Sequence, residues 1–212
     1  MRFKLPLEKM SLAFRSRFFF DAYEEEERAM CKKYLQDTSS VLELGGCIGI
    51  VSCVANARLA SGTKHVVIEA NPELIPWLKL NREVNRAQFS VEHGMLSRTS
   101  DGAFHVGEYI VSGSANSDAG ELVKVPVFEI EKVCEKYRYI PEVVLMDIEG
   151  GEVDFFRENE HWIRDCKTLK TMIIEMHPFI VGEAAVDEVV AILTRLGFRR
   201  VERRSLVEVW QR

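Results

Sequence analysis

Short apolar runs alternate with amphipathic stretches along most of this chain, and that alternation restricts the fold more than any other feature. Four runs have the length of buried strands and are each followed by a stretch with helical spacing: residues 41–44, 66–70, 143–146 and 171–176. Strands separated by helices pair in parallel, because the chain must cross over between them, and it does so with a right-handed turn. The pattern therefore predicts an α/β protein with a doubly wound sheet and helices on both faces.

The other predicted elements follow the same order along the chain. We expect a further strand over residues 89–95, and helices over residues 21–35, 48–59, 72–85, 151–164 and 184–196. Residues 198–203 and 206–210 are expected to form a closing antiparallel hairpin. The apolar pattern weakens between residues 97 and 139, where glycines are frequent. There we expect extra strands or a flexible insert on the substrate side.

The bulk composition is that of one folded domain, because 47% of the 212 residues are hydrophobic and 29% are charged. The net charge of -5 argues against a nucleic acid or an anionic membrane as partner, since these select a basic face. Five cysteines without a C-x-x-C pair predict reduced thiols and a cytoplasmic protein. No apolar run approaches the ~18 residues of a membrane span.

A glycine-rich turn, G-G-C-I-G at residues 45–49, follows the first predicted strand. Ligands of open α/β sheets bind at the carboxyl ends of the strands, and glycines let a ligand approach the backbone closely. A dinucleotide site would require G-x-G-x-x-G, which this turn lacks. Glu43 would also repel a nearby phosphate, whereas a carboxylate suits a ligand that carries an ammonium and a sulfonium.

Glu69 ends the second predicted strand, 24 residues beyond Gly45. An acidic side chain at this point can accept hydrogen bonds from both ribose hydroxyls of an adenosine. The turn and Glu69 together favour S-adenosylmethionine over NAD as the ligand. The residues expected to bind it are Glu43, Gly45, Gly46, Cys47, Gly49, Glu69, Ala70, Asn71, Met95, Leu96 and Asp147, of which Met95 or Leu96 would flank the adenine.

Four motifs, in order, resemble those of the FkbM family of class I methyltransferases. Residues 43–49 (E-L-G-G-C-I-G) are similar to the family's D-x-G-A-N-x-G, and residues 69–72 (E-A-N-P) to its E-P-N-P. Residues 147–152 (D-I-E-G-G-E) resemble D-x-E-G-x-E, and residues 175–178 (E-M-H-P) match E-x-H-P. The departures are Cys47 in place of asparagine and Ala70 in place of proline.

This resemblance implies a Rossmann-like fold with a seven-stranded, mostly parallel sheet. It implies O-methylation, with S-adenosylmethionine as donor and a hydroxyl of a sugar, glycan or glycosylated metabolite as acceptor. In this arrangement residues 1–38 form a segment and a helix that cover the sheet, and residues 39–212 form the methyltransferase domain.

The third and fourth motifs bring chemistry-bearing residues to adjacent strand ends. Methyl transfer to a hydroxyl requires alignment of the acceptor and gains from a general base. His177 is the candidate base, because its ordinary pKa lies near neutrality, although it could instead orient a neighbour. Asp147 and Glu149 are the other candidate catalytic residues, with Asp147 near the acceptor or the cofactor ammonium. Glu149 and Glu152 have an alternative role in holding the turn before the next helix.

A magnesium ion is an alternative that we do not favour. Its ligands would be Asp147, Glu149 and Glu175, and it would lower the pKa of the acceptor hydroxyl. No metal-ligand spacing in the sequence requires such an ion, so we expect a metal-free site.

Three other functions remain open from the sequence. Methylation of nitrogen is disfavoured because residues 147–150 read D-I-E-G rather than N-P-P-Y or D-P-P-Y. An NAD-dependent oxidoreductase is disfavoured by the glycine spacing. A non-catalytic domain that serves assembly is the fourth hypothesis.

Overall fold

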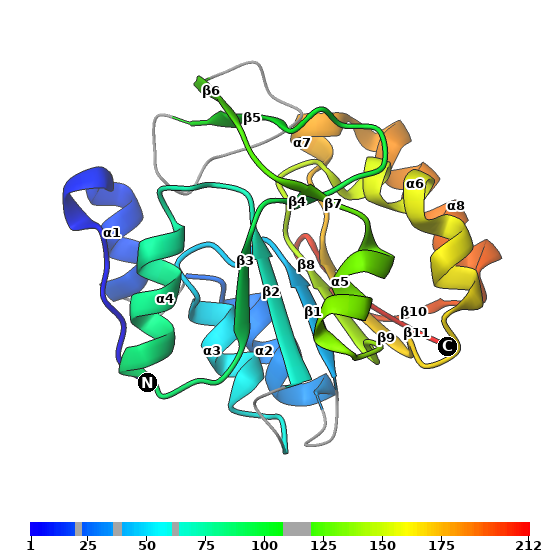
Figure 1. Ribbon diagram of the computed structural model, residues 1–212, viewed down its shortest axis with the longest axis horizontal. Helices are drawn as coiled ribbons and strands as arrows, with labels where there is room; N and C mark the ends of the chain where they lie inside the picture. Colours follow the sequence, from blue (N-terminus) through cyan, green and yellow to red (C-terminus); the bar gives the residue numbers. More distant parts are fainter. Residues whose placement is uncertain (20–22, 36–39, 61–63, 108–119) are drawn as a thin grey trace.

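The computed structural model describes residues 1–19, 23–35, 40–60, 64–107 and 120–212. Its centre is a seven-stranded sheet in the order β10-β11-β9-β8-β1-β2-β3 (Figure 1). The strands are β1 (Val41–Leu44), β2 (His65–Glu69), β3 (Ser90–His93), β8 (Val143–Met146), β9 (Thr171–Glu175), β10 (Arg199–Arg204) and β11 (Val207–Gln211). The first five of these in chain order pair in parallel, and β11 is antiparallel to both β9 and β10. The predicted doubly wound sheet with its closing hairpin is confirmed.

Helices cover both faces of the sheet. One face is covered by α2 (Glu25–Tyr34), α3 (Ile50–Asn56) and α4 (Ile75–Val84), and the other by α5 (Ile130–Tyr137), α6 (Glu152–Asp165) and α8 (Glu183–Arg195). Successive strand residues alternate between the two, as a pleated strand requires. Val143 and Leu145 pack with α2 and α3, whereas Val144 packs with α5, α6 and α8. Because β8 is buried on both faces, it reads as a continuous apolar run, and β1 departs from such a run only at the buried Glu43.

The predicted strand over residues 89–95 is wrong at its end. β3 stops at His93, and Gly94 takes a φ of +147°, where an added Cβ would lie 2.4 Å from the carbonyl oxygen of Pro126. The chain therefore leaves the main sheet at Gly94. Beyond it, β4 (Met95–Leu96) pairs with β7 (Val127–Phe128) in a separate two-stranded sheet.

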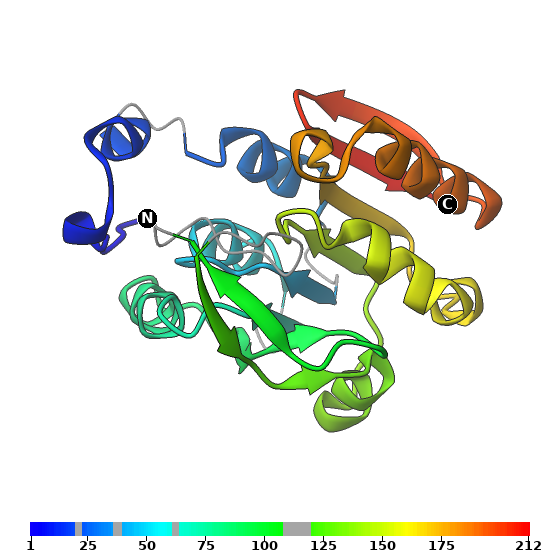
Figure 2. The same cartoon turned by 90° about the horizontal axis from the view of Figure 1, so that it is seen from above.

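The weakly patterned region contains the extra strands that the sequence predicts. β5 (Ala103–Val106) and β6 (Glu121–Lys124) form an antiparallel pair, while residues 108–119 between them lie outside the described part. This pair lies across the carboxyl ends of the parallel strands (Figures 1 and 2). The region also contains α5, a helix that the sequence analysis did not predict.

The predicted helices are present, but their ends differ from the prediction by one to four residues where the structure describes them. The predicted helix over 48–59 corresponds to α3. It begins only at Ile50, because Gly49, with a φ of +85°, lies outside the helical conformation. The helix expected over 21–35 is described from Glu25, and residues 20–22 lie outside the described part. A short helix, α7 (Pro178–Val181), precedes α8 and was not predicted.

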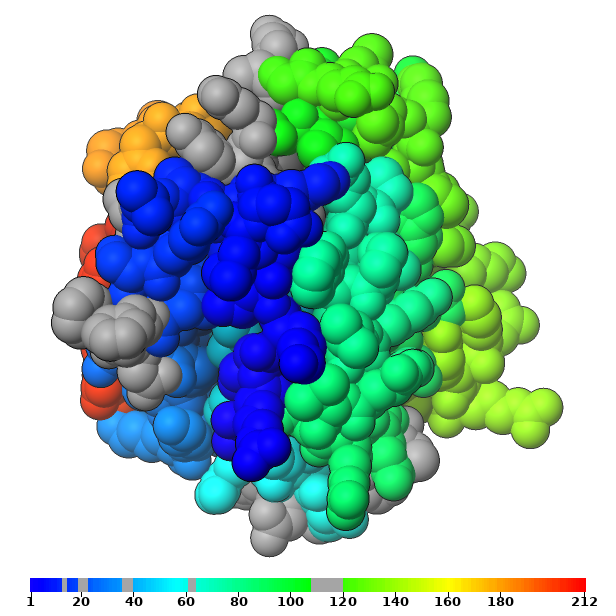
Figure 3. Space-filling view, turned by 90° about the vertical axis from the view of Figure 1, so that its left-hand side faces the viewer, coloured from blue at the N-terminus to red at the C-terminus, as the bar shows by residue number. Residues whose placement is uncertain are grey.

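The N-terminal residues, with a 3-10 helix η1 (Leu7–Lys9) and α1 (Leu12–Phe19), lie along α4 (Figure 3). Asn81 of α4 is fully buried, accepts the backbone N–H of Lys4 at 2.6 Å, and donates to the carbonyl oxygens of Lys4 and Ile48 at 2.9 and 2.8 Å. One turn further, Asn85 makes the same pair of bonds with Arg2. Two asparagine amides thus tie this extended segment to the folded domain.

Two further features bear on the cellular setting. Among the described residues, no helix has the length and apolar character that crossing a membrane requires. The five cysteines are all described, and each is a free thiol.

Candidate functional site

A cavity of about 400 Å³ opens at the carboxyl ends of β1, β2 and β8. Its volume lies in the range of sites that bind small molecules and cofactors. The floor comes from the first turn and the end of β2, with Gly45, Cys47, Glu69 and Asn71. Residues 94–100, which include β4, form one wall, and the end of β8 and α6 form another.

The glycines of the first turn are required by close packing. Gly45 has a φ of +85°, and a Cβ built on it would lie only 1.7 Å from the carbonyl oxygen of Asp147. Cβ atoms on Gly46 and Gly49 would lie 2.4 Å from Val67 and 2.8 Å from Leu78. Gly45 therefore lets the first turn touch the end of β8, while Gly46 and Gly49 let it pack on β2 and α4.

Glu69 anchors the other side of this turn. Its Oε2 accepts the backbone N–H of Cys47, and its Oε1 accepts that of Asn71, both at 2.7 Å. Burial raises the pKa of Glu69 to about 7, although these hydrogen bonds from the backbone act in the opposite direction. Each carboxylate oxygen accepts more than one hydrogen bond, so Glu69 can also receive ligand hydroxyls from the cavity that it lines.

Not all of the residues predicted to bind cofactor line the cavity. Those that do are Gly45, Cys47, Glu69, Ala70, Asn71, Met95, Leu96 and Asp147. Glu43 lies beneath it, where its carboxylate accepts a hydrogen bond from Ser52 at 2.5 Å and lies 2.7 Å from Nε2 of the fully buried His65. Glu43 thus joins β1, α3 and β2, and Gly46 and Gly49 are also outside the lining.

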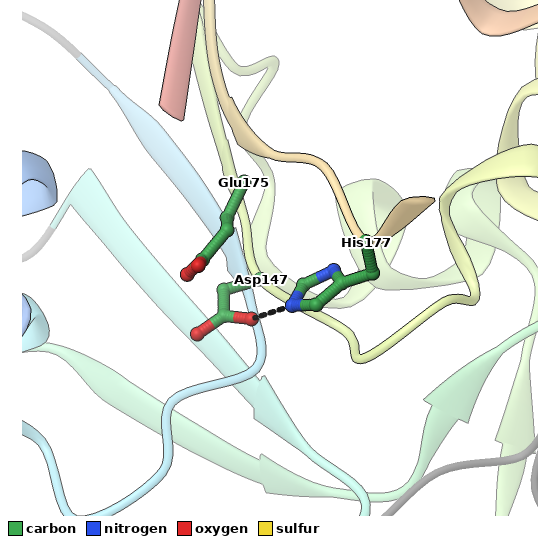
Figure 4. Close-up of side chains that lie close together, drawn as sticks. All are labelled: Asp147, Glu175 and His177. Atoms are coloured by element: carbon green, nitrogen blue, oxygen red, sulfur yellow. Dashed lines mark ion pairs between the residues drawn. The ribbon is translucent and has the colours of Figure 1, made fainter. Parts of the chain in front are cut away.

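A cluster of carboxyl groups and one histidine occupies the ends of β8 and β9. Asp147, Glu175 and His177 each present an atom within 4.8 Å of the others (Figure 4). His177 Nε2 lies 3.5 Å from Asp147 Oδ1 and 3.6 Å from Glu149 Oε2. Burial, followed by repulsion from Asp147, raises the pKa of Glu175 to about 10, and the pKa of Asp147 is raised for the same kind of reason. The three predicted catalytic residues, Asp147, Glu149 and His177, therefore lie together.

Glu152 controls the orientation of His177. This carboxylate is buried at the start of α6 and lies 3.0 Å from His177 Nδ1, and it also accepts the N–H groups of Ile148 and Gly150 at 3.3 and 3.4 Å. Glu152 therefore holds the turn that precedes α6, the alternative role that the sequence suggests. With Nδ1–H donated to Glu152, Nε2 of the neutral ring is an acceptor that points toward Asp147.

The same contacts set the charge of His177. Burial alone would lower its pKa, but the hydrogen bond and charge of Glu152, together with Asp147 and Glu149, raise it to about 9. Because this exceeds the value of ~6.5 in an unfolded chain, the interaction stabilises the fold fully below pH ~6.5. That stabilisation is lost as the pH rises through about 9.

The residues that could hold a metal differ from the set that the sequence suggests. His177 takes the place of Glu149 beside Asp147 and Glu175. Magnesium prefers oxygen ligands, whereas a site that includes imidazole suits a transition metal better. This donor set therefore gives the magnesium alternative little support.

Several cavity residues were not found from the sequence. Tyr23, Asp154, Phe155 and Glu158 all line it. Glu158 of α6 accepts hydrogen bonds from Ser97 Oγ at 2.9 Å and from the N–H of Arg98 at 2.6 Å, and so fixes the loop after β4. Asp154 and Glu158 are four residues apart on α6, but that spacing alone does not reveal which face of the helix meets the cavity.

Comparison with known families decides the classification. A sequence model described as the methyltransferase FkbM domain matches residues 43–200, which contain all four motifs. This chain belongs to the methyltransferase FkbM domain family. Among curated proteins, no sequence matches this FkbM-family chain significantly.

Solved structures share the fold of the FkbM-family chain at low identity. The precorrin-6y C5,15-methyltransferase of Geobacter metallireducens GS-15 matches with a TM-score of 0.54 and 14% identity, over 89% of this chain and 87% of its own. The methyltransferase FkbM of Methylobacillus flagellatus KT gives 0.52 and 14%, over 84% of this chain and 44% of its own. An O-methyltransferase of Bacillus cereus, solved in complex with SAH, gives 0.53 and 9%, over 89% and 81%.

Replacing Gly45 by alanine tests the close approach in the first turn. Gly197 is a matched control, because it also has a φ of +85° but an added Cβ would meet nothing within 4 Å. We expect Gly197→Ala to cost about 1–2 kcal/mol of unfolding free energy from backbone strain alone. Gly45→Ala should cost about 3–5 kcal/mol, because overpacking adds to the strain. Urea unfolding measures both, and equal losses would contradict the contact with Asp147.

Proposed function

We propose that this FkbM-family chain transfers a methyl group from S-adenosylmethionine to a hydroxyl of a sugar or of a glycosylated metabolite. The observation that carries the proposal is the charge of the cavity. Five carboxyl side chains line it, from Glu69, Asp147, Glu149, Asp154 and Glu158, and none of the described lining residues is lysine or arginine. The residues outside the described part contain no lysine or arginine either. A cationic ligand suits such walls.

The residues of the cavity fit this cofactor. Glu69, Met95 and Leu96 line the cavity, which supports a role for Glu69 in accepting the ribose hydroxyls and for Met95 and Leu96 in flanking the adenine. Asp147 also lines the cavity, and its carboxyl group suits either the cofactor ammonium or a hydroxyl of the acceptor. Bound S-adenosylmethionine supplies a methyl group that its sulfonium has already activated.

NAD suits the cavity poorly. Its pyrophosphate needs backbone N–H donors or cationic side chains. In this turn, the N–H of Gly45 is donated to Ile68 and that of Cys47 to Glu69. The carboxylate walls would repel the phosphates as well.

Calorimetry with S-adenosylmethionine and NAD tests the choice of cofactor. We expect binding of the former only, weakened about 10- to 100-fold in Glu69→Ala, because hydrogen bonds to a charged group contribute about 1.5–3 kcal/mol. Glu73→Ala is the control, since Glu73 is exposed and pairs with Lys9. No heat with S-adenosylmethionine, or binding of NAD instead, would remove the proposal.

In the proposed mechanism, His177 takes the proton from the acceptor hydroxyl. Glu152 fixes the ring so that Nε2 is the proton acceptor, and the proton then rests on an imidazolium beside Asp147 and Glu152. Glu149 and Asp147 accept hydrogen bonds from other hydroxyls of the acceptor and so keep its reacting hydroxyl beside His177. The β5–β6 pair, which lies across this end of the sheet, excludes water from the reacting groups.

The raised pKa of His177 predicts an alkaline pH profile. Only the neutral ring can act as base, so kcat/KM should rise about tenfold per pH unit and level off near pH 9. Glu152→Gln removes the charge that raises this pKa, and should move the levelling point to lower pH. His161→Gln, an exposed histidine far from Glu152, is the control. A profile that His177→Gln leaves unchanged would rule out this base.

The same charges restrict the acceptor. An acceptor with a phosphate, sulfate or carboxylate would face Glu149, Asp154 and Glu158, and none of the described lining residues is lysine or arginine. Juxtaposed like charges cost several kcal/mol. We therefore propose neutral or amino-bearing sugars as acceptors, and place the methylation on sugars that carry no nucleoside diphosphate.

A matched acceptor series tests this charge preference. With radiolabelled S-adenosylmethionine, a methyl glucoside and its 2-amino counterpart should be methylated at least ten times more efficiently than the glucuronide and UDP-glucose. Asp154→Asn should reduce the difference in methylation efficiency between the uncharged or amino-bearing acceptors and the anionic ones. Product analysis of the amino sugar separates O- from N-methylation. Equal methylation of UDP-glucose would contradict the charge argument.

A further inference from the structure

Tyr23 reaches the cavity from outside the family-matched residues. It stands just before α2, twenty residues ahead of the first matched position, Glu43. It nevertheless lines the same cavity as Gly45, Cys47 and Asp147. A residue in this position therefore belongs to the site without belonging to any of the four motifs.

The position of Tyr23 is well defined. Its side chain is only 8% exposed and packs in a cluster with Met10, Ile48 and Leu74. Its ring stacks on Phe18, with centroids 4.3 Å apart and an angle of 24° between the planes. Its hydroxyl lies 3.3 Å from Cys47 Sγ. The packing thus brings one phenolic hydroxyl to the first turn.

Cys47 offers only a weakly polar side chain at this turn. Its backbone takes a φ of +46°, and its N–H is already donated to Glu69. Asparagine, the residue at this position of the motif that residues 43–49 resemble, tolerates this left-handed conformation and offers both a donor and an acceptor. A thiol is a weak donor and a weak acceptor, so it cannot supply the same hydrogen bonds.

The Tyr23 hydroxyl has the chemistry that Cys47 lacks. A phenol is both donor and acceptor. Burial, followed by the neighbouring Cys47 and Glu24, raises the pKa of Tyr23 well above its ordinary value, so the hydroxyl stays neutral. The carboxyl of Glu24 also hydrogen-bonds this hydroxyl, which holds an acidic group close to it. The phenol oxygen, whose single proton is shared with Glu24, can accept a hydrogen bond from the ammonium of an amino-acid ligand.

We infer that Tyr23 binds the amino-acid end of the cofactor and supplies there the polar side chain that Cys47 does not. The inference rests on the proposed function, because it takes S-adenosylmethionine as the ligand. It assigns a binding role to a residue just before α2, ahead of the residues that the family model matches.

Two ligands separate a binding role from a merely structural one. S-adenosylmethionine has the amino-acid end, whereas 5′-methylthioadenosine lacks it and keeps the adenosine. By calorimetry, Tyr23→Phe should bind S-adenosylmethionine about tenfold more weakly and 5′-methylthioadenosine as tightly as the unaltered protein does. Tyr34→Phe is the matched control, because the Tyr34 hydroxyl bonds Glu202, away from the cavity. This control should leave both affinities unchanged.

Rescue at the partner position strengthens the test. Cys47→Asn added to Tyr23→Phe should restore most of the lost affinity for S-adenosylmethionine. Unchanged affinity in Tyr23→Phe, or an equal loss for both ligands, would overturn the role of Tyr23 and leave the proposed function standing. Failure of the unaltered protein to bind S-adenosylmethionine would instead overturn the proposed function itself. Retained binding of 5′-methylthioadenosine shows that the variant is folded.

Discussion

The site depends on the contact between Gly45 and the backbone of Asp147. With no Cβ on Gly45, the first turn comes against the end of β8, where any other residue would collide with a carbonyl oxygen. The N–H of Asp147 is donated to Leu44 at 3.0 Å, so the two strand ends are also joined by a backbone bond. The groups proposed to bind the cofactor and the acceptor belong to neighbouring strands, and this contact makes them walls of one cavity.

Across that contact, the two sides of the site differ in their electrostatics. On the β2 side, backbone N–H groups of Cys47 and Asn71 hold the carboxylate of Glu69. On the β9 side, carboxyl groups crowd around a single histidine, and burial with mutual repulsion raises the pKa of Asp147 and Glu175. Burial makes both arrangements costly unless protons or a cationic ligand balance them. Binding a sulfonium compound would place a positive charge beside these buried carboxyl groups.

Much of the fold could be predicted because β1, β2, β8 and β9 are buried on both faces and therefore read as short, mainly apolar runs. The end of the third strand could not, since the turn at Gly94 depends on Pro126, a residue far along the chain. The helix α5 was missed although Ile130, Val133 and Tyr137 have helical spacing, because glycines and polar residues before it conceal the pattern.

The candidate site was predictable only where its residues follow strands directly. Asp147, Glu149 and His177 do so, and they lie together. Glu43 also adjoins a strand end, yet it bonds Ser52 and His65 beneath the turn, because strand alternation alone does not say which groups a buried side chain will meet.

The place of Tyr23 has a consequence for how such enzymes diversify. The sheet and its four motifs carry residues that close packing restricts, such as Gly45. The start of the chain is attached through the backbone of Arg2 and Lys4, and these contacts do not depend on which side chains the two residues carry. Substitutions there can therefore accumulate while the sheet stays unaltered, and a change at Tyr23 alters the cavity that it lines.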